Sequence, residues 1–295
     1  MTFLPGEDKL LAHCNTEELK LNQNLKAIAR EIRCDTIAEI AHLGVGHIGG
    51  CLSVVELLTV LYFDAMRIDP KHPQKKGRDR FICSKGHAGP AVYAALANRG
   101  FFDKSVLLTL NQCGTNLPSH CDMNRTPGID MTTGSLGQGF SCAVGAALGA
   151  KLAKDGATVY TLIGDGESQE GQIWEAAMFA AAKHLDHLIA FTDYNGLQID
   201  GPVAEVNDIA PLAAKWEAFG WDVIEVPDGN DIDQVSSAVK QAQAGQWNGK
   251  PKMVILHTKK GCGMKWAEEL GPANHNTPVP AEIAEAAIRA LREEV

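Results

Sequence analysis

Apolar residues fall along this chain in two patterns: short continuous runs and stretches with helical spacing. Short apolar runs bounded by polar or glycine-rich segments are typical of strands buried in a parallel sheet. They predict strands at residues 81–83, 158–163, 188–192, 223–226 and 253–257. Apolar positions with a period of about 3.6 residues predict helices. We expect these at about residues 16–43, 90–98, 136–154, 172–184, 209–219, 232–244 and 283–291, with a further helix over LLTVLYF.

The order of these elements indicates the fold class. Repeated strand-then-helix order is typical of an α/β fold in which a parallel sheet carries helices on both faces, giving three layers. The chain is therefore expected to be one domain, residues 1–295, with a helical lead-in at about 16–65. Ser53 and Glu56 have the spacing of a capping box for the second helix of this lead-in. Residues 69–70, 71–80 and 272–280 are expected to be loops.

Composition and charge argue against several classes of function. With 295 residues, 45% of them apolar, the chain can bury a full core. A formal net charge of -9 argues against nucleic acid or an anionic membrane as the main partner, because both require clustered Lys and Arg. The eight cysteines show no CxxC pair and no metal-ligand spacing with histidine, so we expect reduced, mostly buried thiols. The N-terminal segment lacks the pattern of a signal peptide, and no apolar run approaches the length of a membrane span, so we expect a cytoplasmic protein.

Two polar clusters follow predicted strands and are the first candidates for chemistry. Gly164, Asp165 and Gly166 come directly after the run at 158–163, and Asn195 follows the run at 188–192. One predicted helix separates them, so a βαβ unit would bring both to the carboxyl edge of the sheet, where ligands bind in such folds. Carboxylate, amide and carbonyl oxygens suit Mg²⁺ or Ca²⁺, and Mg²⁺ commonly completes its coordination with phosphate oxygens. Each cluster alone would more simply be a turn, but their joint position favours an ion site.

A glycine motif near the N-terminus invites a different interpretation. Gly44, Gly46 and Gly49 have the GxGxxG spacing of dinucleotide-binding proteins, which requires a strand immediately before the first glycine. Residues 36–43 have helical spacing instead, so the sequence argues against a dinucleotide site. His47, inside this turn, suggests another use.

Five motifs, in order along the chain, resemble those of thiamine-diphosphate enzymes in their transketolase form. The signature is GDGESQEG at 164–171, followed by a helix, an apolar strand and YNGLQIDG at 194–201. The other motifs are GHIGG at 46–50, RFICSKGHAGP at 80–90, MTTGSLGQG at 131–139 and KGCGMKW at 260–266, with His275 behind it. The resemblance spans nearly the whole chain and is to the N-terminal, diphosphate-binding half of a transketolase. It implies the thiamine-diphosphate-binding fold.

The resemblance implies a role for each matching position. Asp165, Asn195 and the Leu197 carbonyl would bind Mg²⁺, for which Ca²⁺ or Mn²⁺ can substitute. The other implied cofactor contacts are Gly166, Glu167 and Asn195 at the diphosphate, Gly134 and Leu136 along the aminopyrimidine, and His87 and His275 near the diphosphate and reacting centre. His47 and His120 would face the sugar, and Glu170 would join the carboxylate network between the two cofactor sites of a dimer.

These residue types fit the implied chemistry. Cleaving a ketose beside its carbonyl needs a carbanion sink, which the thiazolium of the cofactor supplies. Histidines titrate near neutrality and can exchange protons with sugar hydroxyls. Three positions depart from the family pattern: Ile48 replaces the usual proline, Tyr194 replaces a frequent Asp or Asn, and Asn276 replaces the usual glycine.

The resemblance also implies that half of the active site lies elsewhere. In the family, a second domain supplies the glutamate that protonates the aminopyrimidine and most residues that hold the substrate phosphate. No second α/β domain follows the helix predicted at 283–291. We therefore expect a second copy of this chain and a separate C-terminal transketolase subunit, in an α₂β₂ assembly acting on sugars or sugar phosphates. Two alternatives stay open: the α subunit of another split thiamine-diphosphate enzyme, such as a 2-oxoacid dehydrogenase, and a non-catalytic binding module.

Overall fold

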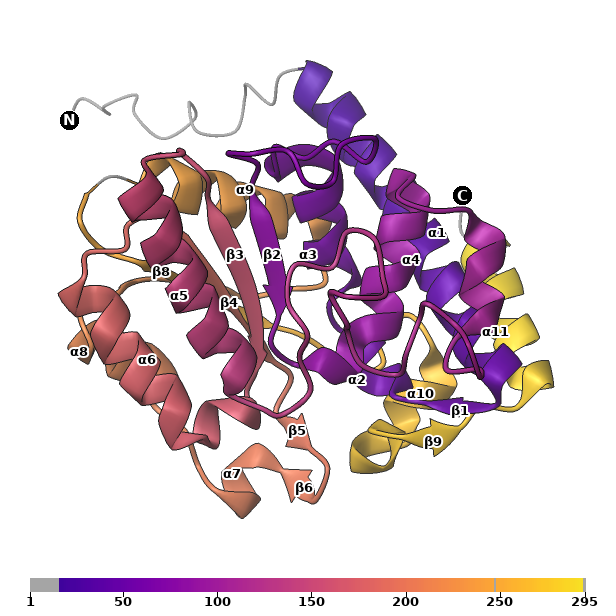
Figure 1. Cartoon of the computed structure of the whole chain (residues 1–295). Coiled ribbons are helices and arrows are strands. Elements are labelled where there is room, and N and C mark those ends of the chain that lie inside the picture. The colour runs from indigo at the N-terminus through magenta and orange to yellow at the C-terminus, as the bar shows by residue number, and fades with distance from the viewer. Residues whose placement is uncertain (1–15, 247, 294–295) are drawn as a thin grey trace, which may run out of the picture.

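A five-stranded parallel sheet in the order β2-β3-β4-β8-β7 lies at the centre of the computed structural model (Figure 1). The structure describes residues 16–246 and 248–293, so Cys14 lies outside the described residues. The strands are β2 (Arg80–Cys83), β3 (Val159–Gly164), β4 (Leu188–Tyr194), β7 (Asp222–Val226) and β8 (Lys252–His257). All five predicted strands are confirmed, with ends that differ by at most two residues, because strands buried on both faces are continuous apolar runs.

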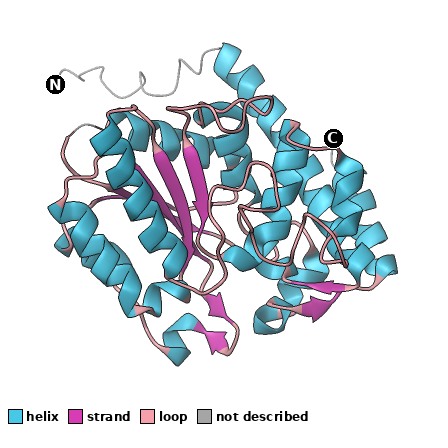
Figure 2. Cartoon of the chain, viewed as in Figure 1, coloured by secondary structure: helices cyan, strands magenta, loops and turns pink. Residues whose placement is uncertain are grey.

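Helices cover both faces of the sheet, which confirms the three-layer α/β prediction (Figure 2). One face carries α5 (Gln138–Ala153), α6 (Gly171–Ala182) and α8 (Leu212–Ala218); the other carries α1 (Thr16–Leu43), α3 (Val55–Val60), α4 (Gly89–Arg99) and α9 (Ile232–Ala244). The remaining helices and helical turns are α2 (Ile48–Leu52), α7 (Val203–Val206), α10 (Lys265–Glu269), α11 (Ala281–Glu293), η1 (Leu61–Ala65), η2 (Gly86–Ala88), η3 (Lys104–Thr109), η4 (Glu167–Gln169) and η5 (Gly271–Asn274). The grouping of residues 1–295 into one domain stays a prediction.

The apolar spacing of the sequence decides how these helices pack. Along α1, Leu25, Ile32, Ile37 and Ile40 are fully buried against the α4 and α3 side of the molecule. On the opposite face, aromatic side chains of the α5 and α8 layer join aliphatic ones in the core, with the rings of Phe140 and Trp216 5.8 Å apart. No helix in the described part of the chain has both the length and the apolar character needed to cross a bilayer.

The parallel topology brings the loops that carry the motifs to one edge. In the register of β3 and β4, Gly164 lies beside Asp193, so the chain segments that follow both strands leave the sheet side by side. Two small antiparallel sheets lie at this carboxyl edge, at the bottom of Figure 1: β5 (Leu197–Gln198) with β6 (Gly201–Pro202), and β1 (Val45–Gly46) with β9 (Thr277–Pro278). Adjacency of the Asp165 and Asn195 clusters is therefore confirmed.

Two local predictions are wrong, and one is confirmed. Ser53 does not cap α3, which begins at Val55, because its hydroxyl donates to Asp193 at 2.7 Å, while Glu56 accepts from Arg33. Residues 272–280 are more than a loop, since part of η5 and all of β9 lie there. The rejection of a dinucleotide site holds, because α1 continues to Leu43, directly before the first glycine of the GxGxxG.

Candidate active site

A cavity of about 350 Å³ opens at the carboxyl edge of the sheet. All twelve site residues predicted from the sequence line it: His47, His87, His120, Gly134, Leu136, Asp165, Gly166, Glu167, Glu170, Asn195, Leu197 and His275. They come from loops that are far apart in the sequence, after β2, β3 and β4, before α5, and beside β1 and β9. The parallel topology therefore collects the five motifs into one site.

The candidate metal ligands lie on adjacent strand ends. Asp165 is 2% exposed, and its carboxylate accepts the Gly166 amide at 2.7 Å and the Gly196 amide at 2.6 Å. Asn195 and the Leu197 carbonyl line the same cavity. The side-chain oxygen of Gln198, also at the cavity, is buried without a hydrogen-bond partner in the described structure. A carboxylate, an amide and a carbonyl with an orphaned acceptor beside them form a donor set that fits Mg²⁺.

Burial changes the electrostatics of Asp165. Desolvation, followed by the nearby charge of Asp193, raises the pKa of Asp165 to about 6, and the two backbone amides only partly oppose this. A cation beside the carboxylate would restore the ionised form. Space beside Gly166 is tight, because a Cβ there would lie 3.0 Å from the Gln198 Cβ.

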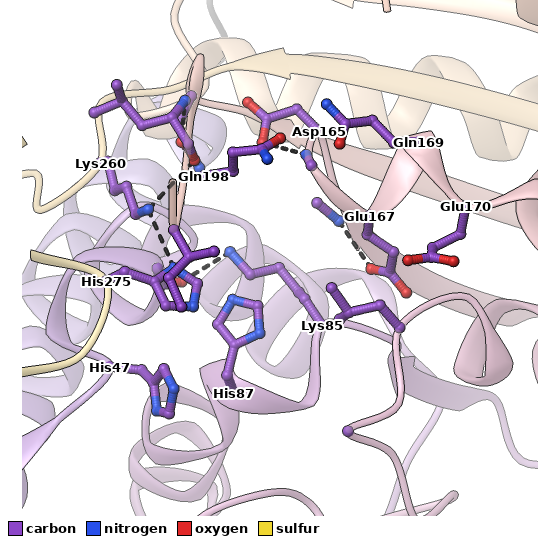
Figure 3. Close-up of a pocket in the computed structure, with 18 of the residues that line it drawn as sticks. His47, Lys85, His87, Asp165, Glu167, Gln169, Glu170, Gln198, Lys260 and His275 are labelled. Atoms are coloured by element: carbon purple, nitrogen blue, oxygen red, sulfur yellow. Dashed lines mark hydrogen bonds between the residues drawn. The ribbon is translucent and has the colours of Figure 1, made fainter. Parts of the chain in front are cut away.

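Glu167 braces the loops around the site. Its carboxylate accepts the Ser84 hydroxyl, the Gly137 amide at 2.8 Å and the Gly164 amide at 3.0 Å. These donors follow β2, precede α5 and end β3, so one buried side chain fixes three segments of the cavity wall. Glu170, three residues on, is exposed at the rim of the cavity (Figure 3).

The four histidines form a cluster on the other side of the cavity from Asp165. The His47 ring lies centrally, 5.4 Å from that of His87, 5.5 Å from His120 and 5.3 Å from His275. Pairing of β1 with β9 brings the chain beside His47 against the chain beside His275. Figure 3 shows His47, His87 and His275 below the carboxylates, with the Lys85 side chain reaching between the two groups.

The histidines of this cluster are unprotonated near pH 7 in the absence of a ligand. Burial lowers the pKa of His47 to about 4, and the charges of His120 and two lysines add to the effect. Burial and then Lys260 lower the pKa of His275 to about 3. The pKa values of His87 and His120 are also lowered by burial. The rings are therefore neutral near pH 7, and each can accept a proton when an anion enters the cavity.

Two lysines in the cavity wall were missed by the sequence analysis. Lys85 is 2% exposed, and Lys260 is 5% exposed with its ammonium 3.3 Å from the Leu197 oxygen. Burial and the charge of Lys85 lower the pKa of Lys260 to about 8. Both lie inside motifs that resemble those of the family, SKGHA and KGCG, and this position in the sequence could have identified them as candidate site residues. Gln169, Gln198 and Ile199 were missed as well, although they lie in or between the same motifs.

The three departures from the family pattern lie in different surroundings. Ile48 is fully buried and fills core space beside the cavity. Tyr194 packs its ring against His257, with centroids 5.2 Å apart, and does not line the cavity. Asn276 is exposed and lines a smaller hollow of about 120 Å³, whose wall includes the other side of His47.

Comparison with known proteins agrees with this geometry. Residues 24–294 match the family model described as "Transketolase, thiamine diphosphate binding domain". The chain belongs to the transketolase family. It is 55% identical over 271 residues to the 6-deoxy-6-sulfo-D-fructose transketolase subunit SqwG of Clostridium sp., covering 92% of this chain and 97% of that subunit. It is 41% identical over 250 residues to an apulose-4-phosphate transketolase subunit of Phocaeicola vulgatus, covering 85% and 87%.

Solved transketolases share the fold. The transketolase from Leishmania mexicana superposes with a TM-score of 0.83 at 31% identity, over 90% of this chain and 41% of that one. The Campylobacter jejuni transketolase gives a TM-score of 0.81 at 29% identity, over 92% and 43%. The chain thus spans less than half the length of these solved transketolases, while it matches subunit-named relatives along nearly their whole length. It corresponds to the N-terminal half of a transketolase, and neither a 2-oxoacid dehydrogenase subunit nor a non-catalytic module is favoured.

Proposed function

We propose that this chain is the diphosphate-binding subunit of a two-chain transketolase, which moves a two-carbon ketol unit from a ketose to an aldose. The observation that carries the proposal is the meeting of all twelve predicted residues in one cavity. The active enzyme would contain a second copy of this chain and a separate C-terminal subunit. Glu170, exposed at the rim of the cavity, is placed where a partner can reach it.

Residues of this chain would hold the diphosphate end of the cofactor. Asp165, Asn195 and the Leu197 carbonyl would bind Mg²⁺, an ion that would neutralise the charge of the diphosphate. The ammonium of Lys260 lies beside Leu197 and adds positive charge to the same side of the cavity. Gly134, whose φ of 149 favours glycine, and Leu136 would line the aminopyrimidine.

The histidines would manage protons at the reacting end. The bound thiazolium supplies the carbanion sink that ketol transfer requires. His47 and His120 are neutral near pH 7 and can accept a proton from a sugar hydroxyl, then return it. His87 and His275 would contact the diphosphate and the reacting centre, where the lysine charges favour anionic oxygen.

The names of two relatives support a proposal on the substrate class. One acts on a 6-deoxy-6-sulfo-hexose and another on apulose 4-phosphate, according to their names. By these names, both sugars carry an acidic group, a sulfonate in one and a phosphate in the other. We propose a ketose of this kind as the donor, with the sulfonated hexulose as the first candidate because that relative is more similar.

Mixing the subunits tests the proposal. The purified chain alone should lack ketol transfer and should gain it when the C-terminal subunit, thiamine diphosphate and Mg²⁺ are added. Sulfonated and phosphorylated ketoses are compared as donors, with 2-oxo acids as the control for the dehydrogenase alternative. Robust turnover by the isolated chain, or activity on 2-oxo acids only, would overturn the proposal.

A further inference from the structure

A single buried carboxylate, that of Asp193 near the end of β4, receives four hydrogen bonds. Its donors are the Ser53 hydroxyl at 2.7 Å, the Asn195 side-chain nitrogen at 2.9 Å, the Lys85 ammonium and the Thr258 hydroxyl. They come from the segment between α2 and α3, the end of β4, the end of β2 and the end of β8. Asp193 therefore ties together four segments around the candidate active site.

This arrangement fixes the orientation of the Asn195 amide. A carboxylate accepts hydrogen bonds and cannot donate, so the atom of Asn195 that faces Asp193 has to be the nitrogen. The amide oxygen is then turned away, and it accepts the Leu197 backbone amide at 3.1 Å. An amide oxygen has two lone pairs, so one stays free of hydrogen bonds within the described residues.

Lys85 holds the carboxylate in place. Its ammonium bonds Asp193 and the Gly50 carbonyl, the latter at 2.9 Å, and the side chain is 2% exposed. Burial alone would lower the pKa of Lys85, but Asp193 raises it above its ordinary value, so the ammonium stays charged. Gly50 leaves room for this contact, since a Cβ there would lie 3.4 Å from the ammonium and 3.3 Å from the His87 ring.

We propose that Lys85 is a positioning residue that acts through Asp193 to turn the Asn195 amide oxygen toward the metal position. The inference rests on the proposed function, in which Asn195 binds Mg²⁺. Lys85 reaches Asn195 only through Asp193, so its effect is on the geometry of a ligand. In Figure 3 its ammonium extends into the region between the histidines and the Asp165 side of the cavity.

A matched control exists in the same sheet. Lys252 at the start of β8 is also 2% exposed and pairs with Asp222 at 2.8 Å, but it lies at the amino end of the strands, away from the cavity. The match is in the buried lysine, since the Asp222 side chain is 34% exposed, whereas that of Asp193 is fully buried. If burial of a paired lysine mattered only for folding, neither pair would affect the metal. If Lys85 positions Asn195, only its pair will affect the metal.

The test changes both members of each pair, because removing one alone leaves an unpaired buried charge. Lys85→Met/Asp193→Asn and Lys252→Met/Asp222→Asn are prepared in the full chain with its C-terminal subunit. Calorimetric titration with Mg²⁺ at saturating thiamine diphosphate should show Kd raised about tenfold or more in the first variant, as for other outer-shell partners. The second variant should keep the Kd of the unsubstituted complex.

A second readout needs neither metal nor cofactor. Hydrogen exchange of the Leu197 amide, followed by NMR in the free chain, should accelerate about tenfold in Lys85→Met/Asp193→Asn, because its acceptor on Asn195 is no longer fixed. Unchanged exchange and unchanged Mg²⁺ affinity would overturn the inference, as would equal losses in both paired variants. If no protein binds Mg²⁺ and cofactor, the proposed function fails, while exchange still decides whether Lys85 orders Asn195.

Discussion

Each end of the central sheet contains a buried lysine paired with an aspartate, but Asp193 at the carboxyl end is fully buried, whereas the Asp222 side chain at the amino end is 34% exposed. At the amino end, the Lys252 ammonium has three acceptors: Asp222 at 2.8 Å, the Asn248 side chain at 2.6 Å and the Lys250 carbonyl at 2.9 Å. Its three protons are used, and the charge is neutralised locally. The Lys252 ammonium at this end of the sheet is therefore satisfied by neighbouring protein groups.

The carboxyl end carries both signs of charge, because Lys85 and Lys260 line the cavity together with Asp165, Glu167 and Glu170. Asp193 is shared among four donors, and Lys260 has a carbonyl and a histidine nitrogen as its neighbours, both at 3.3 Å. Within the described residues, none of the four cavity histidines pairs with a carboxylate. Carboxylates in one part of a cavity and lysines beside neutral histidines in another favour a ligand that combines a cation with an anionic group. The polar groups at the amino end are thus satisfied within the sheet edge, whereas those at the carboxyl end surround the cavity where we propose that the cofactor binds.

The largest expected effect on cofactor affinity is that of removing Asp165. Asp165→Ala should raise the Kd for thiamine diphosphate by about 100-fold or more in the presence of Mg²⁺, because the only carboxylate among the proposed ligands is lost. Isothermal calorimetry on the complex with the C-terminal subunit measures it. An unchanged Kd would contradict the metal assignment.

Asp222→Ala is the control at the other end. It should leave the Kd unchanged and lower the free energy of unfolding by about 1–3 kcal/mol, because Lys252 keeps two of its three acceptors. A loss of cofactor affinity as large as that of Asp165→Ala would show that the two ends are not separable.

A smaller effect is expected from Lys260. Lys260→Met removes a cation that faces the proposed diphosphate position. It should raise the Kd for thiamine diphosphate about tenfold at saturating Mg²⁺, a loss comparable to that of one charge-assisted hydrogen bond. Its neighbour Lys259, paired with Glu268 on the surface, is the control. Lys259→Met should bind the cofactor as the unsubstituted chain does, and equal losses in both variants would refute a specific role for Lys260.

Much of the fold and site could be predicted because their signals are local. Strands buried on both faces are continuous apolar runs, and the motif residues, such as Asp165 and His87, are recognisable by their neighbours in the sequence. The order of strands and helices then decides which loops meet at the carboxyl edge. This is why the predicted site residues lie in one cavity.

The rest depends on contacts that the sequence does not display. Lysine is rarely buried, so nothing in the local pattern predicts that Lys85 pairs with Asp193, 108 positions away. Ser53 has the spacing of a helix cap, but a stronger acceptor, the Asp193 carboxylate, takes its hydroxyl. The strand at 277–278 consists of two residues and is paired with β1, far away in the sequence. In each case a tertiary partner overrides a local preference.

The cavity histidines, none of which pairs with a carboxylate within the described residues, should make stability depend on pH. The pKa of His275 is about 3 in the folded chain and close to its ordinary 6.5 when unfolded. Between these values the unfolded chain binds the extra proton, so folding stability falls as the pH drops through this window. The raised pKa of Asp165 acts in the opposite direction, so the test is the difference between two proteins.

His275→Asn removes the effect of one histidine. In cofactor-free chain, urea unfolding at about pH 7.5 and about pH 5 should show a smaller loss of stability in the variant, equivalent to at most about one proton. Removal of a histidine outside the cavity, by His72→Asn, is the control, since that side chain is exposed. An identical pH dependence of the free energy of unfolding in all three proteins would show that the neutral histidine cluster does not lower folding stability at acidic pH.

Helix α5 connects the two ends of the sheet. Glycine-to-alanine substitutions in it should have the smallest effects, and the free energy of unfolding should change with opposite signs at its two ends. Gly149 is exposed near its end, and a Cβ there would meet nothing within 4 Å. Gly149→Ala should raise the free energy of unfolding by about 0.5–1 kcal/mol, because glycine is unfavourable inside a helix. Gly139→Ala, at the cavity end of the same helix, should lower it, since its Cβ would lie 2.7 Å from the Ser84 Cα and disturb the donor to Glu167. Urea unfolding of the free chain measures both; equal responses would mean that the cavity end tolerates change as readily as the other. If Gly149→Ala stabilises the free chain but weakens the assembled enzyme, another chain packs against α5 at this glycine.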